Sequence, residues 1–593
     1  MSPQKGIALI TGSAQGIGRG IAIRLARDGF DIALNDLPTK REQLAAVAIE
    51  VEELGRKACI VIADVTIEEE VKNMIADTVK GLSRLDVMVA NAGIPAANTV
   101  LATTVEDWER TFAVNARGVF LCYKHAAGQM ISQGHGGRII GASSIAGKIG
   151  FPSAAAYCAS KFAVRGLTQT AALELGKYNI TVNAYAPGVI QTQMRNVSLT
   201  DEDSTNYLVQ LMGNRPIKHN GQPEDIASIV SYLASKEAHF ITGQCVSAQC
   251  YPPHRRFKAC QDVKLALIFI HNLGTARSIL TMSQPKGVAL ITGSAQGIGR
   301  AIAIRLARDG FDIALNDIPA KTAVLEDLAA ELQRGGESYG TYHPRTCIVA
   351  CDISKEDEVK RMIDTAVDVL GSLDVMVANA GISAITDILN ETLESWERVM
   401  KINATSAFLC YKYAAVQMVR QGPGGRIIGA SSMVGIRGKR LSPIQVWRLN
   451  YVYYEAEPNL LSYSASKFAV RALTQAASMQ LGRYGITVNS YAPGIIETPM
   501  VVASRDVIAK RGEVDYFQQK IDLSGVGYIG QPEDIANTVA YLASKEAHFI
   551  TGKLPISQVL YANSPVVPCV SGQCHRQATY NCAVPKKPTR DRI

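Results

Sequence analysis

The chain has 593 residues, of which 47% are hydrophobic and 19% charged, with a net charge of +8. This composition is typical of a globular protein, and the basic excess forms no long stripe with interleaved aromatic residues, which argues against nucleic-acid binding. No secretory leader precedes the first apolar run, and the apolar run at residues 265–270 is too short to cross a bilayer, so we expect a cytoplasmic protein without membrane contacts. The twelve cysteines follow no pairing or zinc-finger pattern, so we expect reduced thiols and no bound metal.

The first clear pattern, at residues 7–36, predicts a strand, a tight glycine turn, a helix and a second strand that ends in an acid. The turn contains Gly12, Gly16 and Gly18, and the acid is Asp36. This order is that of the dinucleotide-binding βαβ unit, in which the glycines let the pyrophosphate approach the backbone. Free N–H groups and the positive dipole end at the start of the helix would hold the phosphates.

Helices and strands continue to alternate after Asp36, which predicts an α/β fold, a doubly wound parallel sheet with helices on both faces. In such a sheet, ligands bind at the carboxyl ends of the strands. A polar segment that ends at Asn220 is expected to form a substrate lid. The further elements expected in this half are helices at residues 42–54, 68–79, 108–129 and 157–175, and strands at residues 58–63, 85–90, 138–141 and 180–184.

Residues 288–317 repeat residues 7–36 with two differences, which indicates two copies of a whole domain. The residues that follow Met282 also mirror the N-terminus. One hypothesis is therefore that two adjacent genes are joined in one reading frame, and the alternative is a two-domain protein with a long linker. The predicted organisation is a first copy at residues 1–249, a linker at 250–281, a second copy at 282–560 and an irregular tail at 561–593.

Four polar residues of the first copy follow the glycine turn in a recognisable order. Asn115 lies within an expected helix, Ser144 follows a strand, and Tyr157 and Lys161 are four apart, on one helix face. With the glycine turn, the Asn-Ala-Gly at residues 91–93 and the Pro-Gly at 187–188, this set resembles the short-chain dehydrogenase/reductase family over nearly the whole first copy. Residues 135–172 more particularly resemble the diacetyl (acetoin) reductases, also called 2,3-butanediol dehydrogenases.

The resemblance implies a catalytic role for each of these four side chains. Tyr157 would be the general acid in ketone reduction, and Lys161 with the oxidised nicotinamide would lower its pKa from the ordinary value near 10. Ser144 would hydrogen-bond the substrate carbonyl, and Asn115 would hold a water that links Lys161 to solvent. The neighbouring Ser143 is expected to support the end of the strand instead.

The resemblance also implies a nicotinamide cofactor, and Asp36 favours NAD(H), because its carboxylate can accept the ribose hydroxyls and repel a 2′-phosphate. Gln15 stands where phosphate-preferring relatives often have a basic residue. In the first copy the implied cofactor residues are Gly12, Gln15, Gly16, Ile17, Gly18, Asp36, Asp64, Val65, Asn91, Ala92, Gly93, Tyr157, Lys161, Pro187, Gly188, Val189, Ile190 and Thr192. In the second copy they are Gly293, Gln296, Gly297, Ile298, Gly299, Asp317, Asp352, Ile353, Asn379, Ala380, Gly381, Tyr463, Lys467, Pro493, Gly494, Ile495, Ile496 and Thr498.

The second copy departs from the first inside its catalytic segment. Serine and tyrosine are 13 positions apart in the first copy but 31 apart in the second, and the 18 extra residues fit best at 439–456. We expect this insertion to displace the serine from the tyrosine and to lower activity, although a loop that bulges outward would be harmless. Neither copy has the family's usual last strand, which puts stability and self-association in doubt. The second set of catalytic residues is Asn403, Ser432, Tyr463 and Lys467.

The sequence thus predicts an NAD(H)-dependent oxidoreductase that interconverts small ketones and secondary alcohols by hydride transfer. We expect a small-molecule substrate and self-association through the dehydrogenase domains. Alternatives are a 3-oxoacyl reductase, a polyol or sugar dehydrogenase, and a scaffold that binds NAD without turnover. A turnover assay separates the scaffold from the enzymes.

Overall fold

The computed structural model describes residues 4–196, 220–239, 241–247, 285–335, 342–435, 459–510, 529–548 and 550–553. The expected linker, the insertion, the tail and most of the expected lid lie outside these residues. No helix within them is long and apolar enough to cross a membrane.

The first copy is built on a seven-stranded sheet in the order β3-β2-β1-β4-β5-β6-β7. Every pairing in it is parallel, which confirms the predicted doubly wound sheet. The expectation that this copy lacks its last strand is wrong, because the short strand β7 pairs with β6. The strands are β1 (Gly6–Thr11), β2 (Phe30–Asp36), β3 (Ala58–Ile62), β4 (Val87–Ala90), β5 (Gly137–Ala142), β6 (Ile180–Ala186) and β7 (Cys245–Ser247).

Helices cover both faces of this sheet because its central strands are apolar on both sides. On one face, Ala8 and Ile10 of β1 belong to a core with buried residues of α1, α2 and α8. On the other, Ile7 and Leu9 belong to a core with residues of α3, α5 and α6. The helices are α1 (Gly16–Arg27), α2 (Arg41–Glu53), α3 (Glu68–Leu82), α4 (Val105–Phe112), α5 (Gly118–Gln133), α6 (Ala155–Leu175) and α8 (Pro223–Ala234).

The second copy repeats this plan with a six-stranded sheet, in the order β10-β9-β8-β11-β12-β13. Its strands are β8 (Val288–Thr292), β9 (Asp312–Asn316), β10 (Thr346–Ile348), β11 (Val375–Ala378), β12 (Arg426–Ala430) and β13 (Thr487–Tyr491). Its helices are α10 (Gly297–Arg308), α11 (Thr322–Arg334), α12 (Glu356–Leu370), α13 (Leu393–Met400), α14 (Ser406–Gln421), α16 (Leu461–Leu481), α17 (Pro499–Lys510) and α19 (Pro532–Ala543).

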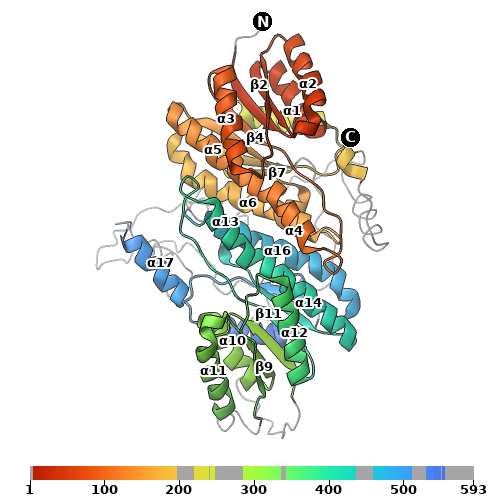
Figure 1. Ribbon diagram of the computed structural model, residues 1–593, viewed down its shortest axis with the longest axis vertical. Coiled ribbons are helices and arrows are strands. Elements are labelled where there is room, and N and C mark those ends of the chain that lie inside the picture. The colour runs from red at the N-terminus through yellow and green to blue at the C-terminus, as the bar shows by residue number, and fades with distance from the viewer. Residues whose placement is uncertain are drawn as a thin grey trace, which may run out of the picture.

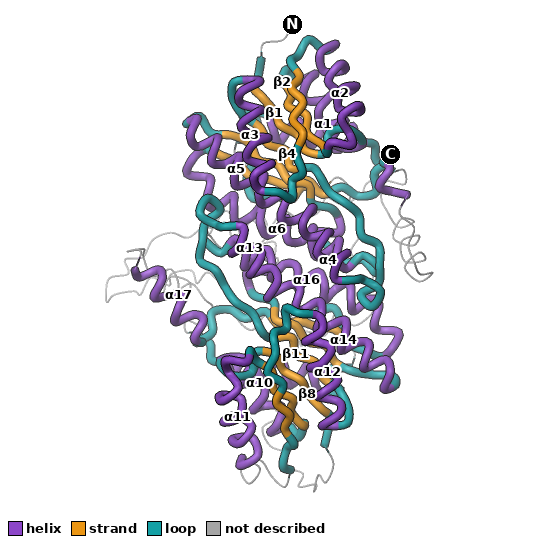
Figure 2. The backbone as a smooth tube through the Cα atoms, in the orientation of Figure 1, coloured by secondary structure: helices purple, strands orange, loops and turns teal. Residues whose placement is uncertain are grey.

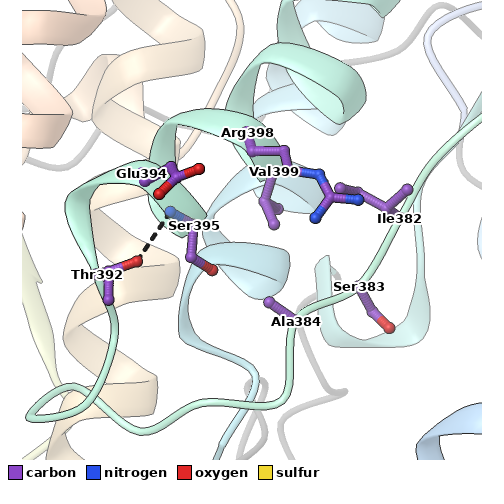
Figure 3. A pocket seen from close by; sticks show the side chains of 8 residues that line it. All are labelled: Ile382, Ser383, Ala384, Thr392, Glu394, Ser395, Arg398 and Val399. Carbon is purple, nitrogen blue, oxygen red and sulfur yellow. Dashed lines mark hydrogen bonds between the residues drawn. The ribbon is translucent and has the colours of Figure 1, made fainter.

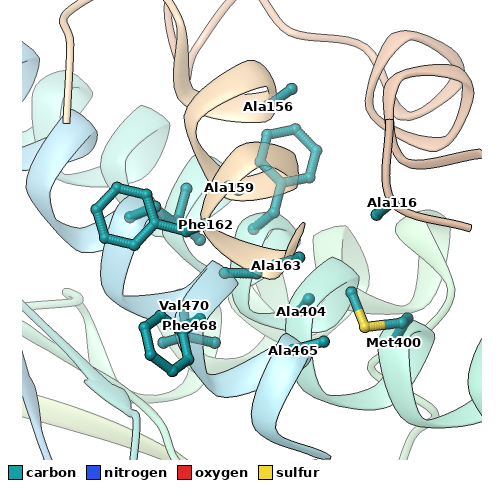
Figure 4. Packing of buried hydrophobic residues seen from close by; sticks show 14 of the residues in the cluster. Ala116, Ala156, Ala159, Phe162, Ala163, Met400, Ala404, Ala465, Phe468 and Val470 are labelled. Carbon is teal, nitrogen blue, oxygen red and sulfur yellow. The ribbon is translucent and has the colours of Figure 1, made fainter. Parts of the chain in front are cut away.

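The two copies lie end to end, with α6 of the first against α16 of the second between the two sheets (Figures 1 and 2). Both helices are buried on nearly all sides, as expected for helices whose small and apolar residues occupy every face. Phe162 and Phe468 belong to one buried cluster that includes residues of both copies (Figure 4). The copies therefore share a hydrophobic core.

Two pairs of aromatic side chains also stack across the interface between the copies. Trp108 stacks on Phe408 with ring centroids 4.4 Å apart, and Phe120 stacks on Trp396 at 4.5 Å. The indole N–H of Trp108 also donates to the Thr405 hydroxyl at 3.1 Å. Nearly parallel stacks of this kind contribute beyond the area they bury, so α4 and α5 of one copy are tied to α14 and α13 of the other.

Candidate active site

The glycine turn of the first copy has the close packing that a dinucleotide site requires. A Cβ atom at Gly18 would lie 2.1 Å from the Gly12 carbonyl oxygen, so only glycine fits there. Among the described residues, no side chain caps the start of α1 and no acid stands in its first turn. The first N–H groups of this helix therefore remain available for an anion, and the turn fits the pyrophosphate of a dinucleotide.

Asp36 lies at the end of β2, beside this turn. Its Oδ2 accepts the Ala14 N–H at 3.2 Å, and its Oδ1 accepts the Leu37 N–H at 2.9 Å. The second copy repeats both bonds at Asp317, at 3.1 and 2.9 Å. The structure thus brings each acid next to its glycine turn, as the sequence predicts.

Asn91 joins the next strand to the turn. Its Nδ2 donates to the Thr11 carbonyl at 2.8 Å, and its Oδ1 accepts the Tyr185 hydroxyl at 2.7 Å. The second copy has the same pair, Tyr491 and Asn379, at 2.7 Å. Sequence reasoning missed these two tyrosines, although both precede the Ala-Pro-Gly of their copy.

The remaining expected cofactor residues lie along the same edge, after β3, β4 and β6. The Thr192 methyl would lie 3.5 Å from a Cβ at Gly16, so the segment after β6 touches the glycine turn. The Asp64 carboxylate accepts the Thr66 N–H at 2.8 Å and so shapes its own turn. Ile190 forms an isolated bridge with Gly221. The edge is continuous, but most of the expected lid lies outside the described residues.

The four expected catalytic side chains of the first copy converge at this edge. Ser144, at the end of β5, is hydrogen-bonded to the Tyr157 hydroxyl. The Lys161 ammonium lies 5.7 Å from the centre of the Tyr157 ring and donates to the Ala142 carbonyl at 2.9 Å. Ser143 donates to the Lys161 carbonyl at 3.0 Å and so links the end of β5 to α6.

Asn115 lies in a π-helical turn, Ala113–Arg117, between α4 and α5. Its Oδ1 accepts the Ile94 N–H at 2.8 Å, and its Nδ2 donates to the Ile94 carbonyl at 2.9 Å. A Cβ at Gly93 would lie 3.2 Å from both the Asn115 Oδ1 and the Lys161 Nζ. Asn115 and Lys161 therefore flank the same glycine.

Burial sets the acid strengths in this site. Burial raises the pKa of Tyr157 to about 12, although the hydrogen bond with Ser144 acts in the opposite direction. It lowers the pKa of Lys161 to about 8. The lowering of the Tyr157 pKa expected from Lys161 together with the oxidised nicotinamide concerns the cofactor-bound site and stays a prediction.

The second copy assembles the same site despite its insertion. Ser432 is hydrogen-bonded to the Tyr463 hydroxyl, so the expectation that the insertion displaces this serine is wrong. The Lys467 ammonium lies 5.4 Å from the Tyr463 ring centre and donates to Ala430 at 2.9 Å. Asn403 accepts the Ile382 N–H at 2.8 Å. Burial raises the pKa of Tyr463 and lowers that of Lys467 to about 8.

A cavity of about 180 Å³ lies beside this second site (Figure 3). It lies between the loop after β11 and the start of α13, where the Thr392 hydroxyl caps the helix by accepting the Ser395 N–H at 3.1 Å. Its lining side chains are Ile382, Ser383, Ala384, Thr392, Glu394, Ser395, Arg398 and Val399. The loop that follows Gly381 therefore borders this cavity.

Comparison with known proteins places both copies in one family. The family described as enoyl-(acyl carrier protein) reductase matches residues 12–249 and 448–556, and the one described as short chain dehydrogenase matches residues 287–443. The short-chain dehydrogenase/reductase eriH of Hericium erinaceus is 50% identical over 244 residues, 41% of this chain and 95% of the relative. The L-2,3-butanediol dehydrogenase of Corynebacterium glutamicum is 42% identical over 248 residues, 40% of this chain and 95% of the relative.

Among solved structures, acetoin dehydrogenase YohF of Salmonella typhimurium is 35% identical, covers 41% of this chain and 94% of its own, and gives a TM-score of 0.37. The sequence matches span both halves of the chain and include the glycine turns and the four expected catalytic residues of each copy. The chain therefore belongs to the short-chain dehydrogenase/reductase family, whose members are oxidoreductases that act on alcohols and ketones.

Proposed function

We propose that the chain is an NAD(H)-dependent oxidoreductase that interconverts small ketones of the diacetyl or acetoin type with secondary alcohols. The observation that carries this proposal is the convergence of Ser144, Tyr157 and Lys161 at the sheet edge that holds the glycine turn. The similarity to an L-2,3-butanediol dehydrogenase supports the substrate class. We propose the same activity for the second copy, because its site repeats this arrangement.

The chain's own residues supply the proton chemistry. A bound nicotinamide supplies or accepts the hydride, and the glycine turn, Asp36 and Lys161 are the groups that would hold this cofactor. The Tyr157 hydroxyl donates its proton to the ketone oxygen during reduction, and takes one back during alcohol oxidation. Ser144 donates a hydrogen bond to the same oxygen as its negative charge develops. Lys161, when protonated, stabilises the phenolate that remains on Tyr157.

Asp36 and Asp317 support a preference for NADH over NADPH, because a carboxylate at this place repels a 2′-phosphate. We expect the ratio of kcat/KM with NADH to that with NADPH to exceed one for each copy. Asp36→Ser should lower this ratio by roughly 5- to 140-fold at the first copy, as expected for the loss of about 1–3 kcal/mol of discrimination. The matched variant Asp317→Ser should act at the second copy alone. A wild-type preference for NADPH would refute this assignment.

A 3-oxoacyl reductase is the second candidate function, favoured by the acyl-carrier-protein description of the family that matches residues 12–249. The two candidates separate in one assay of NADH oxidation, with diacetyl, acetoin and a 3-oxoacyl thioester compared at equal concentration. The proposal predicts the higher kcat/KM for the small ketones. A higher value for the thioester would replace the first candidate with the second, and no turnover of either would leave a cofactor-binding scaffold.

A further inference from the structure

One acidic side chain of the first copy is buried against the active-site segments of the second. Glu174 lies near the end of α6 and is only 9% exposed. Its Oε2 accepts the Ile388 N–H at 2.6 Å, and its Oε1 accepts the Asn459 N–H at 2.9 Å. Both donors are backbone groups of the other copy, so this carboxylate bridges the interface with both oxygens in use.

The two donors belong to segments that shape the second active site. Ile388 lies in the loop that leads from Asn379-Ala380-Gly381, at the cofactor edge, to α13. Asn459 has φ of 61° and immediately precedes Leu460, the N-cap of α16. Its carbonyl accepts the Thr386 N–H at 3.0 Å, so the loop and the helix start are also bonded to each other. Tyr463 follows Asn459 by one helical turn.

The position of Asn459 gives the contact its importance. Asn459 is the first described residue after the segment that contains the insertion at 439–456. Glu174 accepts the backbone N–H of Asn459 from across the interface. Asn459 itself has a left-handed backbone conformation, which costs energy for a non-glycine residue. The contact thus fixes the start of the helix that carries Tyr463, which is hydrogen-bonded to Ser432 although 31 positions separate the two in sequence.

The reverse contact exists but differs in chemistry. Gln480 occupies the position of α16 that matches Glu174, 17 residues after the catalytic tyrosine. Its Oε1 accepts the Val100 N–H of the first copy at 2.7 Å. Gln475 accepts the Gly150 N–H at 3.0 Å, in the loop that precedes α6. Each copy therefore anchors the other's active-site loops, the first with a carboxylate and the second with amides.

Resting on the proposed function, we propose that Glu174 is a positioning residue of the second active site, which is therefore built from both copies. The two N–H groups that it accepts hold the loop before α13 and the start of α16, and through them the hydroxyl of Tyr463. Glu174→Gln keeps the shape of the side chain but offers one oxygen for two donors. The unpaired N–H would then face an amide N–H₂, which is costly in a buried site.

The test separates the two sites in the full chain. Turnover in a Tyr157→Phe background reports the second copy, and turnover in a Tyr463→Phe background reports the first. Glu174→Gln should lower kcat of the second copy by roughly 10- to 100-fold, as expected for a displaced catalytic group, and should change the first by less than about twofold. Gln480→Leu is the matched control and should show the opposite pattern.

Hydrogen exchange of the same variants provides a readout that does not need turnover. Glu174→Gln should speed exchange of the amides of Ile388 and Asn459, while the matching segment of the first copy, around Val100, stays unchanged. If exchange changes but neither background turns over a ketone, the proposed function fails and the anchor stands. Equal loss at both sites would indicate a merely structural interface residue, and no loss at the second site would overturn the inference.

Discussion

Replacing Gly18 with alanine should weaken NADH binding at the first copy and leave the second unchanged. The new Cβ would lie 2.1 Å from the Gly12 carbonyl oxygen and 2.6 Å from the Asn91 amide nitrogen, far inside normal contact. Overpacking of this kind costs about 1–3 kcal/mol. If this cost destabilises the NADH-bound state relative to the free chain, the Kd for NADH rises about 5- to 140-fold, at 1.4 kcal/mol per tenfold change.

Calorimetric titration with NADH measures this effect, because the wild-type chain should bind two molecules and the variant only one with unchanged affinity. The matched control is Gly20→Ala in the same helix, since the second copy already carries Ala301 at that place. A Cβ at Gly20 would lie 3.0 Å from a proline side-chain atom, which leaves room for a small shift. Two equivalent high-affinity sites in Gly18→Ala would refute the assignment of this turn to the cofactor.

Two further predictions concern stability. Phe162→Ala should lower the free energy of unfolding by about 3–5 kcal/mol and shift the urea transitions of both copies, because Phe162 is fully buried in their shared core. The control Tyr232→Ala, at an exposed side chain, should change the free energy of unfolding by less than about 0.5 kcal/mol. A shift confined to the first copy would show independent domains. Burial, with Asp387 and Glu391 nearby, raises the pKa of Glu174 to about 7. The folded chain then binds this proton more tightly than the unfolded one, so wild-type stability should fall relative to Glu174→Gln as the pH rises from about 4.5 through about 7, and parallel pH profiles would contradict the assignment.

Much of the site could be predicted because its parts are local in sequence. The glycine turn and Asp36 belong to one βαβ unit, and the four-residue spacing of Tyr157 and Lys161 puts both on one helix face. Ser144 follows from the rule that parallel strands end at the same edge. These inferences need only the periodicity of helices and strands, and the second copy repeats them.

The rest depends on contacts between distant residues. The spacing of Ser432 and Tyr463 suggested a displaced site, but β12 and the anchored start of α16 bring the two together whatever the length of chain between them. Glu174 differs from Gln480 by one atom, and nothing in the sequence shows that either faces the other copy. How strongly burial raises the pKa of Tyr157 could not be predicted either, because it depends on how deeply the fold buries the hydroxyl.

The central claim is that one chain carries two assembled active sites, each with its own catalytic tyrosine. The most direct test is the NADH-dependent reduction of diacetyl by four full-length chains: wild type, Tyr157→Phe, Tyr463→Phe and the double variant. Loss of the proton donor should cost each site about 100- to 10,000-fold, so each single variant should keep the turnover of the other site and the double variant should keep almost none. Full turnover in the double variant, or complete loss in either single variant, would contradict the account.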